Sequence, residues 1–203
     1  MIAIDIEASG TNPEKHSILA LGALDFDNPT NQFYMECRLW DGAHVEEDAM
    51  EVNGVTEEEL RDPSRASEAE LVTAFIDWTK DIRGWNLLSQ NPAFDLSFIR
   101  AAIHRTHLDF PFPVRTLDVH TLAYMHMVTK GAQPPFNIEK HGSALNLDHV
   151  LSYCGIPEEP KPHNALMGAK CHAEAASRLL YNKMLLPEFE IYAIPWVATA
   201  KVQ

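Results

Sequence analysis

The 203 residues include 29 acidic and 16 basic side chains, which gives a formal net charge of −13 at pH 7. This charge argues against a protein that binds long nucleic acids without selectivity, because such proteins hold phosphates with clustered Lys and Arg. It leaves a metal-dependent enzyme open, since bound cations can neutralise both acidic ligands and a phosphate group.

The cysteine content and the lack of long apolar runs limit the architecture further. Cys37, Cys154 and Cys171 are far apart and outside any C-x-x-C pattern, so neither a disulfide framework nor a thiolate zinc site is indicated. We therefore expect a cytoplasmic protein in a reducing compartment. No stretch reaches the roughly 18 apolar residues of a membrane-spanning helix, and the first ten residues do not resemble a signal peptide. The length fits one domain at 1–185 with a C-terminal extension at 186–203.

The N-terminal part of the chain predicts strands followed by helices. Three apolar runs separated by Asn, Pro, Gly and Asp clusters predict an antiparallel meander with strands at 2–8, 18–26 and 32–39. The acidic segment 43–61 has the pattern of a helix-turn-helix. A helix is predicted at about 67–82, because its apolar residues are spaced mostly three to four apart.

The C-terminal part alternates strands and helices. We expect strands at 84–90 and 114–117, and helices at 94–106, 119–129, 146–154 and 165–183. The segment 130–142 is rich in Pro, Gly and polar residues and predicts a mobile loop. Strands followed by alternating strands and helices predict an α/β fold, with a mixed central sheet of about five strands flanked by helices.

Two acidic residues lie in the first predicted strand. Asp5 and Glu7 are two positions apart, so their carboxylates point to one face of the sheet while Ile4 and Ile6 point to the other. On an edge strand such a pair would simply face solvent. The apolar flanks instead indicate a central strand, where two unpaired acids would be costly unless they bind a cation.

Two further residues lie at the starts of predicted helices. Asp95 falls in the first turn of the helix after Asn91-Pro92, where by itself it would be explained as a cap or dipole partner worth about 0.5–2 kcal/mol. His163 precedes the last long helix. A lone histidine is usually a surface or hydrogen-bonded residue, although near pH 7 it can also deprotonate a metal-bound water.

Together these segments resemble a known family. D-x-E at 5–7, N-x-x-F-D at 91–95 and H-x-A-L at 163–166 are similar in order and spacing to the three motifs of the DEDDh 3′→5′ exonucleases. That family includes proofreading and RNase T-like enzymes. The segment A-x-x-x-N-G-V-T at 49–56 also resembles one that many members contain. The resemblance covers roughly 1–183 and implies a ribonuclease H-like exonuclease fold.

The resemblance also implies a site and a reaction. Asp5, Glu7 and Asp95 would bind two divalent ions, Mg²⁺ or Mn²⁺, and His163 would be the general base for hydrolysis at single-stranded 3′ ends of DNA or RNA. Residues of the same motifs are expected to contact the substrate, namely Ala8, Ser9, Asn91 and Phe94. No membrane partner is expected, and the oligomeric state is open, a homodimer included.

The chain departs from the family pattern at one position. The third motif usually carries an Asp five residues after its histidine, and this chain has Gly168 there. One explanation is a close helix-to-sheet contact that admits no side chain, and another is a substitution that inactivates the enzyme. The third is compensation by His172, one helical turn further on the same face, which would favour Mn²⁺, Zn²⁺ or Co²⁺. Glu174 would point away.

Two alternatives to an active nuclease follow from this departure. The chain could be a catalytically impaired exonuclease-like domain that acts as a nucleic-acid-binding or assembly module. It could also be an unrelated acidic α/β interaction domain in which the three motifs match by accident.

Overall fold

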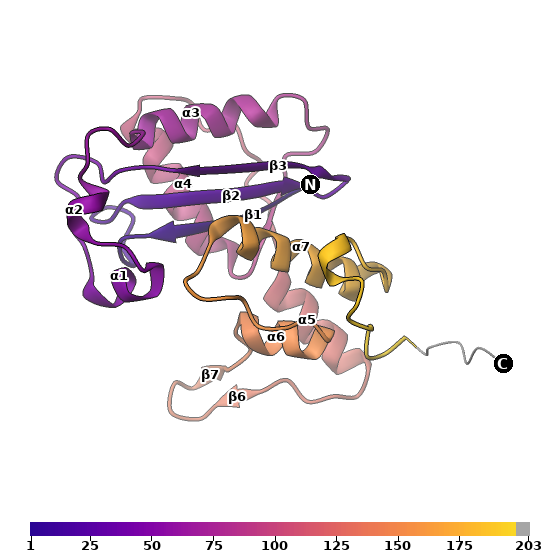
Figure 1. The fold of residues 1–203 in the computed structure, drawn as a ribbon. Helices are drawn as coiled ribbons and strands as arrows, with labels where there is room; N and C mark the ends of the chain where they lie inside the picture. Colours follow the sequence, from indigo (N-terminus) through magenta and orange to yellow (C-terminus); the bar gives the residue numbers. More distant parts are fainter. Residues whose placement is uncertain (198–203) are drawn as a thin grey trace.

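A five-stranded mixed sheet lies at the centre of the computed structural model, which describes residues 1–197 (Figure 1). In spatial order its strands are β3 (Asn28–Glu36), β2 (Ile18–Asp25), β1 (Ile2–Ala8), β4 (Leu87–Ser89) and β5 (Leu117–Asp118). The first three form the predicted antiparallel meander, and β4 and β5 add in parallel to β1. The α/β class, the mixed sheet and its strand number are thus confirmed.

One strand starts earlier than the sequence predicts. β3 begins at Asn28 rather than at position 32, and it includes Pro29. The sequence analysis assigned this proline to a turn. Because β3 lies at the edge of the sheet, a residue without a backbone N–H can be accommodated there.

Seven α-helices surround the sheet within residues 1–197. They are α1 (Glu47–Asn53), α2 (Glu57–Leu60), α3 (Glu68–Thr79), α4 (Pro92–Arg105), α5 (Val119–Thr129), α6 (Leu147–Cys154) and α7 (Ala165–Tyr181). Capping boxes begin α2 at Thr56 and α3 at Ser67. The segment expected as a mobile loop carries a small hairpin of β6 (Phe136–Asn137) and β7 (Gly142–Ser143), and a 3₁₀ turn η1 (Pro187–Phe189) lies in the tail.

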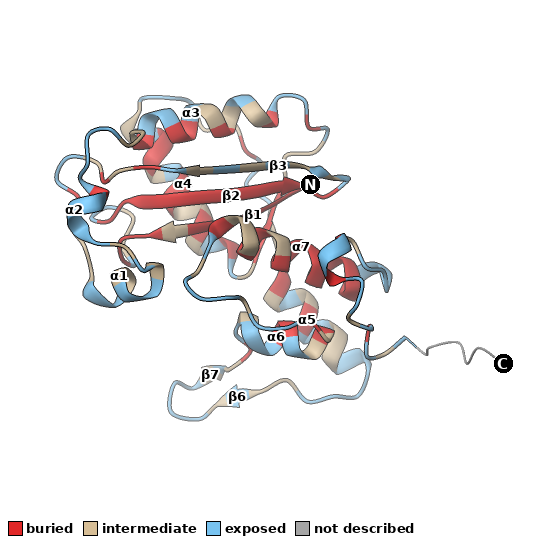
Figure 2. Ribbon diagram, viewed as in Figure 1, coloured by how far each residue is buried: buried red, intermediate tan, exposed pale blue. Residues whose placement is uncertain are grey.

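Two apolar cores lie on opposite faces of the sheet. On one face α3 and α4 cover Ile2, Ile4 and Ile6 of β1, and on the other α7, with α5 and α6, covers Ala3. Figure 2 shows β2 buried along its whole length between these layers. Since side chains alternate along a strand, the residues that follow Ala3 at odd positions face α7.

Helix α7 lies unusually close to the sheet. Gly22 of β2 pairs with Asp5 of β1, and a Cβ added to Gly22 would overlap the backbone of Ala165 and Leu166 at the start of α7. Only glycine permits this approach, because any side chain would push the helix away. The contact brings the first turn of α7 directly over the acidic end of β1.

The described part of the C-terminal extension packs on its own domain. The Arg178 guanidinium donates to the Glu174 carboxylate at 2.7 Å and to the carbonyl oxygens of Cys154 and Phe189, while Glu174 accepts from the backbone N–H groups of Leu185 and Leu186 at the start of the tail. Both charged side chains are fully buried. The ion pair therefore joins α7, α6 and the tail.

Within residues 1–197, no helix combines the length and the apolar composition that crossing a bilayer requires.

We expect Arg178→Met to lower the free energy of unfolding by about 3–5 kcal/mol, because it leaves the Glu174 carboxylate buried without its partner. Unfolding in guanidinium chloride measures this change. Lys80→Met is the matched control, since Lys80 pairs with Asp77 in an exposed position, and it should alter stability by less than about 1 kcal/mol. Equal effects of the two changes would contradict a structural role for the buried pair.

Candidate active site

Asp5 and Glu7 lie on the face of β1 that α7 covers, and both are half-buried. Burial raises the pKa of Asp5 well above its ordinary range, and the negative charges of Asp95, Glu7 and Glu159 raise it further. Burial, followed by the charges of Glu159 and Asp95, raises the pKa of Glu7 to about 8. The two carboxylates thus occupy a place that disfavours negative charge when no cation is bound.

Asp95 approaches the same place from the neighbouring strand. It lies in the first turn of α4, is 3% exposed, and accepts a 2.7 Å hydrogen bond from Ser89 Oγ at the end of β4. Asn91, in the left-handed conformation at φ 57°, turns the chain into α4, and its N–H donates to Asp118. Burial raises the pKa of Asp95 to about 7. The turn and the hydrogen bond fix where this carboxylate points.

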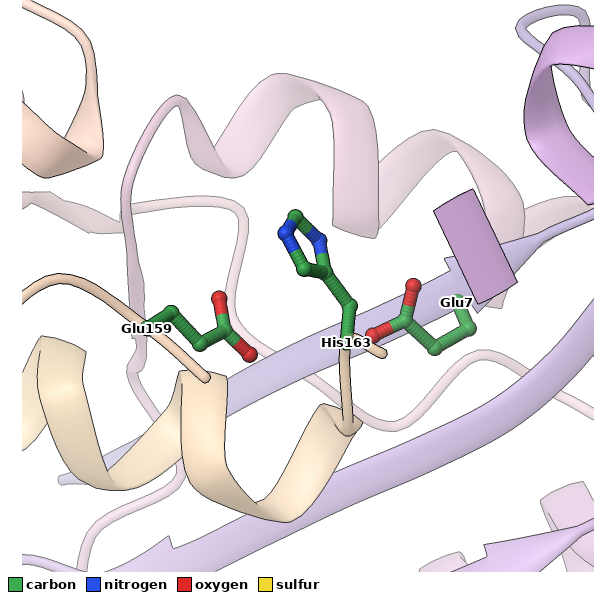
Figure 3. Close-up of side chains that lie close together, drawn as sticks. All are labelled: Glu7, Glu159 and His163. Carbon is green, nitrogen blue, oxygen red and sulfur yellow. The ribbon is translucent and has the colours of Figure 1, made fainter. Parts of the chain in front are cut away.

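The third part of the site precedes α7. The side chain of Asn164 accepts from the N–H groups of Leu166 and Met167 and so starts the helix, which leaves His163 just outside it. Ligand atoms of His163, Glu7 and Glu159 all lie within 4.8 Å of one another. Figure 3 shows the carboxylates of Glu7 and Glu159 directed toward each other on either side of His163.

Glu159 is the residue that the sequence analysis missed. It lies in the loop between α6 and α7, where no helical or strand periodicity indicates the direction of a side chain. The available signal was the pair Glu158-Glu159 four to five residues before His163. Burial raises the pKa of Glu159, while the nearby His163 lowers it.

Gly168 faces Asp5 across the contact between α7 and β1. A Cβ at this position would lie 2.7 Å from Cγ of Asp5 and closer still to one of its carboxylate oxygens. The close approach agrees with the explanation that a helix-to-sheet contact leaves no room for a side chain here while Asp5 keeps this position. A carboxylate at position 168 would displace the carboxylate of Asp5.

His172 is buried and hydrogen-bonded to the sheet. It is 2% exposed, and its Nδ1 lies 2.8 Å from the carbonyl oxygen of Ile4, to which it donates. Burial lowers its pKa to about 4, so the ring is neutral near pH 7. It lies against the backbone of β1 rather than in the cluster of Glu7, Glu159 and His163. Glu174 points away, as expected, into its pair with Arg178.

The four residues expected to contact substrate have different surroundings. Ser9 is fully buried, and its hydroxyl donates to the His44 carbonyl and accepts from the Ser17 N–H, so it is used within the fold. Ala8 and Phe94 line an open hollow of about 320 Å³ that also borders Glu7. Asn91 is exposed at the start of α4. Two of the four, Ala8 and Phe94, therefore border open space beside Glu7.

The donor set fits divalent cations. Carboxylate oxygens are the ligands that Mg²⁺ and Mn²⁺ prefer, and a cation would relieve the repulsion that raises the pKa values of Asp5 and Glu7. The neighbouring imidazole of His163 can accept a proton from a water held by such a cation. The arrangement is thus suited to metal-assisted hydrolysis.

Comparison with known proteins also indicates a nuclease. The sequence model of the RNase_T family, described as Exonuclease, matches residues 2–175. The 3′-5′ DNA exonuclease Cap18 of Escherichia coli is 28% identical over 185 residues, covering 85% of this chain and 87% of that protein. Ribonuclease T of Vibrio campbellii is 28% identical over 184 residues, with 76% and 84% covered.

Solved structures show the same fold. The nuclease domain of 3′hExo, a DEDDh family member bound to rAMP, superposes with a TM-score of 0.67 at 19% identity, over 91% of this chain and 93% of that one. E. coli Exonuclease I in complex with a 5cy-dT13 oligonucleotide gives a TM-score of 0.69 at 18% identity over 89% of this chain. The matched region spans only 41% of the Exonuclease I chain. These neighbours have the exonuclease type of the ribonuclease H-like fold.

We expect Glu7→Gln to stabilise the metal-free protein at high pH only. Glu7 is protonated in both the folded and the unfolded chain below its ordinary pKa of 4.5, and the folded state loses stability as pH rises from there to its raised pKa of about 8. The variant escapes this loss, so its Tm advantage should grow from about zero near pH 5 to several degrees near pH 8.

Thermal unfolding with EDTA at a series of pH values measures this difference. Glu190→Gln is the control, because Glu190 is exposed and distant in sequence from the motifs, and it should show no such trend. A Tm advantage of Glu7→Gln that is independent of pH would contradict the proposed cause. Excess Mg²⁺ should stabilise the parent protein more than the variant.

Proposed function

Since the chain belongs to the RNase_T family of exonucleases, we propose that it hydrolyses single-stranded nucleic acid in the 3′→5′ direction with two divalent ions, Mg²⁺ or Mn²⁺. The observation that carries this proposal is that Glu7 of β1 lies beside His163, which precedes α7, while Asp5 of β1 and Asp95 of α4 are close enough for their charges to act on each other. Three separate segments of the chain supply these residues. Such convergence argues against an accidental match of motifs.

Each side chain has a distinct role in the proposed reaction. Asp5 and Glu7 hold the cations from the sheet, and Asp95 supports them from α4 with its orientation fixed by Ser89. Bound together, two cations would activate a water and stabilise the leaving 3′-oxygen. His163 takes the proton from the attacking water. We leave His172 out of the ligand set because it lies against the backbone of β1 and outside the cluster of Glu7, Glu159 and His163.

The hollow beside Glu7 supports binding of a terminal nucleotide. Ala8 and Phe94 line it together with Val52 of α1, and an aromatic ring beside an open space can stack on a base. We propose that Asn91 contacts the same nucleotide from its exposed position. The similar proteins include one named as a DNA exonuclease and others named as ribonucleases. The proposal therefore covers single-stranded 3′ ends of both DNA and RNA.

The proposal extends to domain limits and location. We assign the exonuclease domain to residues 1–185 and treat 186–203 as an extension, whose residues 186–197 pack through the buried Leu186, Phe189 and Ile194.

We also propose a cytoplasmic location. The support is that Cys37, Cys154 and Cys171 are free and buried, and a protein with three unpaired thiols suits a reducing compartment.

We expect His163→Ala to lower kcat by about 10²–10⁴-fold, the usual effect of removing a positioned general base, with a much smaller loss of oligonucleotide affinity. Asp5→Asn and Glu7→Gln should abolish turnover. His104→Ala is the matched control, since His104 is exposed near the end of α4, and it should keep parental activity.

Digestion of 5′-labelled DNA and RNA oligonucleotides, with Mg²⁺ and with Mn²⁺, measures these rates. A ladder of products shortened from the 3′ end is the expected pattern. A parent protein that binds oligonucleotides but yields no products under either metal would contradict the proposal. That result would favour the catalytically impaired binding or assembly module instead.

A further inference from the structure

The motif at the start of α7 lacks its usual carboxylate, and the structure offers another one nearby. We propose that Glu159 replaces the missing acid at position 168 as a metal-binding carboxylate. This inference rests on the proposed function, because it concerns the ions that the reaction would use. It goes beyond that function by assigning a ligand from the loop before α7 instead of from the helix.

The first step is that an acid at position 168 would require the Asp5 side chain to move. Asp5 occupies the space in front of Gly168, so that a Cβ there would lie 2.7 Å from Asp5 Cγ. The helix cannot retreat without losing a second contact, since its backbone at Ala165 rests on Gly22 of β2. With Asp5 in this position, a fourth carboxylate can reach the site only from another direction.

The second step is that Glu159 reaches the site. Its ligand atom lies within 4.8 Å of those of Glu7 and His163, and three residues of loop separate it from His163 (Figure 3). The backbone N–H of Asn164 lies 3.5 Å from Glu159 Oε1, which ties the carboxylate to the start of α7. Glu159 thus reaches the cluster from the loop that precedes α7.

The third step concerns charge. The negative charge of Glu159 raises the pKa values of both Asp5 and Glu7, so it acts on the same small volume as the two expected ligands. Within residues 1–197, no Lys or Arg forms an ion pair with Glu159. A half-buried carboxylate that repels two others would be unfavourable unless a cation is shared among them.

The identity of the ligand also affects metal preference. Compensation by an imidazole such as His172 would shift the preference toward Zn²⁺ or Co²⁺, whereas a carboxylate keeps a donor set of oxygens. With Glu159 the site has four carboxylates, namely Asp5, Glu7, Asp95 and Glu159, so it retains the charge that two divalent cations require. With Gly168 in place of the usual Asp, one carboxylate ligand then comes from the loop before α7 instead of from the helix, and the type of ligand stays the same.

Calorimetric titration of the metal-free protein with Mn²⁺ tests this inference without any nuclease assay. We expect Glu159→Gln to raise the Kd for Mn²⁺ at least about 10-fold, as loss of a coordinating group does. Glu158→Gln is the matched control, because Glu158 is the adjacent residue and is exposed, and it should change the Kd less than about 2-fold. Without metal, Glu159→Gln should have an equal or higher Tm, since it removes repulsion.

Three outcomes would overturn the inference. One is an unchanged Kd for Glu159→Gln. Another is a lower Tm of this variant without metal, which would make the carboxylate a structural group. A third is an equal loss of affinity in Glu158→Gln, which would indicate a general effect of charge. The variant Glu7→Gln distinguishes failure of the Glu159 assignment from failure of the whole metal site. If Glu7→Gln weakens Mn²⁺ binding while Glu159→Gln does not, only the role of Glu159 is wrong. If neither variant weakens binding, the proposed metal site fails as well.

Discussion

The close contact between α7 and the first two strands is the constraint on which the rest of the site depends. A Cβ at Gly22 of β2 would collide with the backbone of α7, and a Cβ at Gly168 of α7 would collide with the Asp5 side chain of β1. That approach holds His163 beside Glu7 and presses the helix against Asp5. With Asp5 in this position, it also leaves no space for a carboxylate at position 168. One packing arrangement thus places the histidine beside Glu7 and Asp5 against Gly168.

Negative charge is the second feature of the site, and it has a cost. Burial and mutual repulsion raise the pKa values of Asp5 and Glu7, and Asp95 is almost fully buried nearby. In the absence of a bound cation, these clustered carboxylates lower the stability of the folded protein. The cores on both faces of the sheet and the buried pair of Glu174 and Arg178 supply rigid support for it. The site is consistent with a protein that binds cations, because cations would neutralise the negative charge of these carboxylates.

The sequence predicted the parts of the site that lie on regular elements. Alternation along 2–8 placed Asp5 and Glu7 on one face, and the Asn91-Pro92 break placed Asp95 in the first turn of α4. Glu159 could not be predicted in this way, because its position depends on how a loop folds back over residues 150 positions away in the chain. Gly168 indicated a close contact, but only the register of α7 on β1 identifies Asp5 as the partner. The small hairpin of β6 and β7 has no alternating pattern and was missed for the same reason.

The most direct test of this account is a crystal structure of the protein soaked with Mn²⁺, with the ions located by anomalous scattering. The account predicts anomalous peaks within about 2.5 Å of the carboxylate oxygens of Asp5 and Glu7, with Glu159 turned toward the same ions. Peaks that lie elsewhere on the acidic surface, or a site at Asp5, Glu7 and Glu159 without anomalous peaks at saturating Mn²⁺, would contradict it.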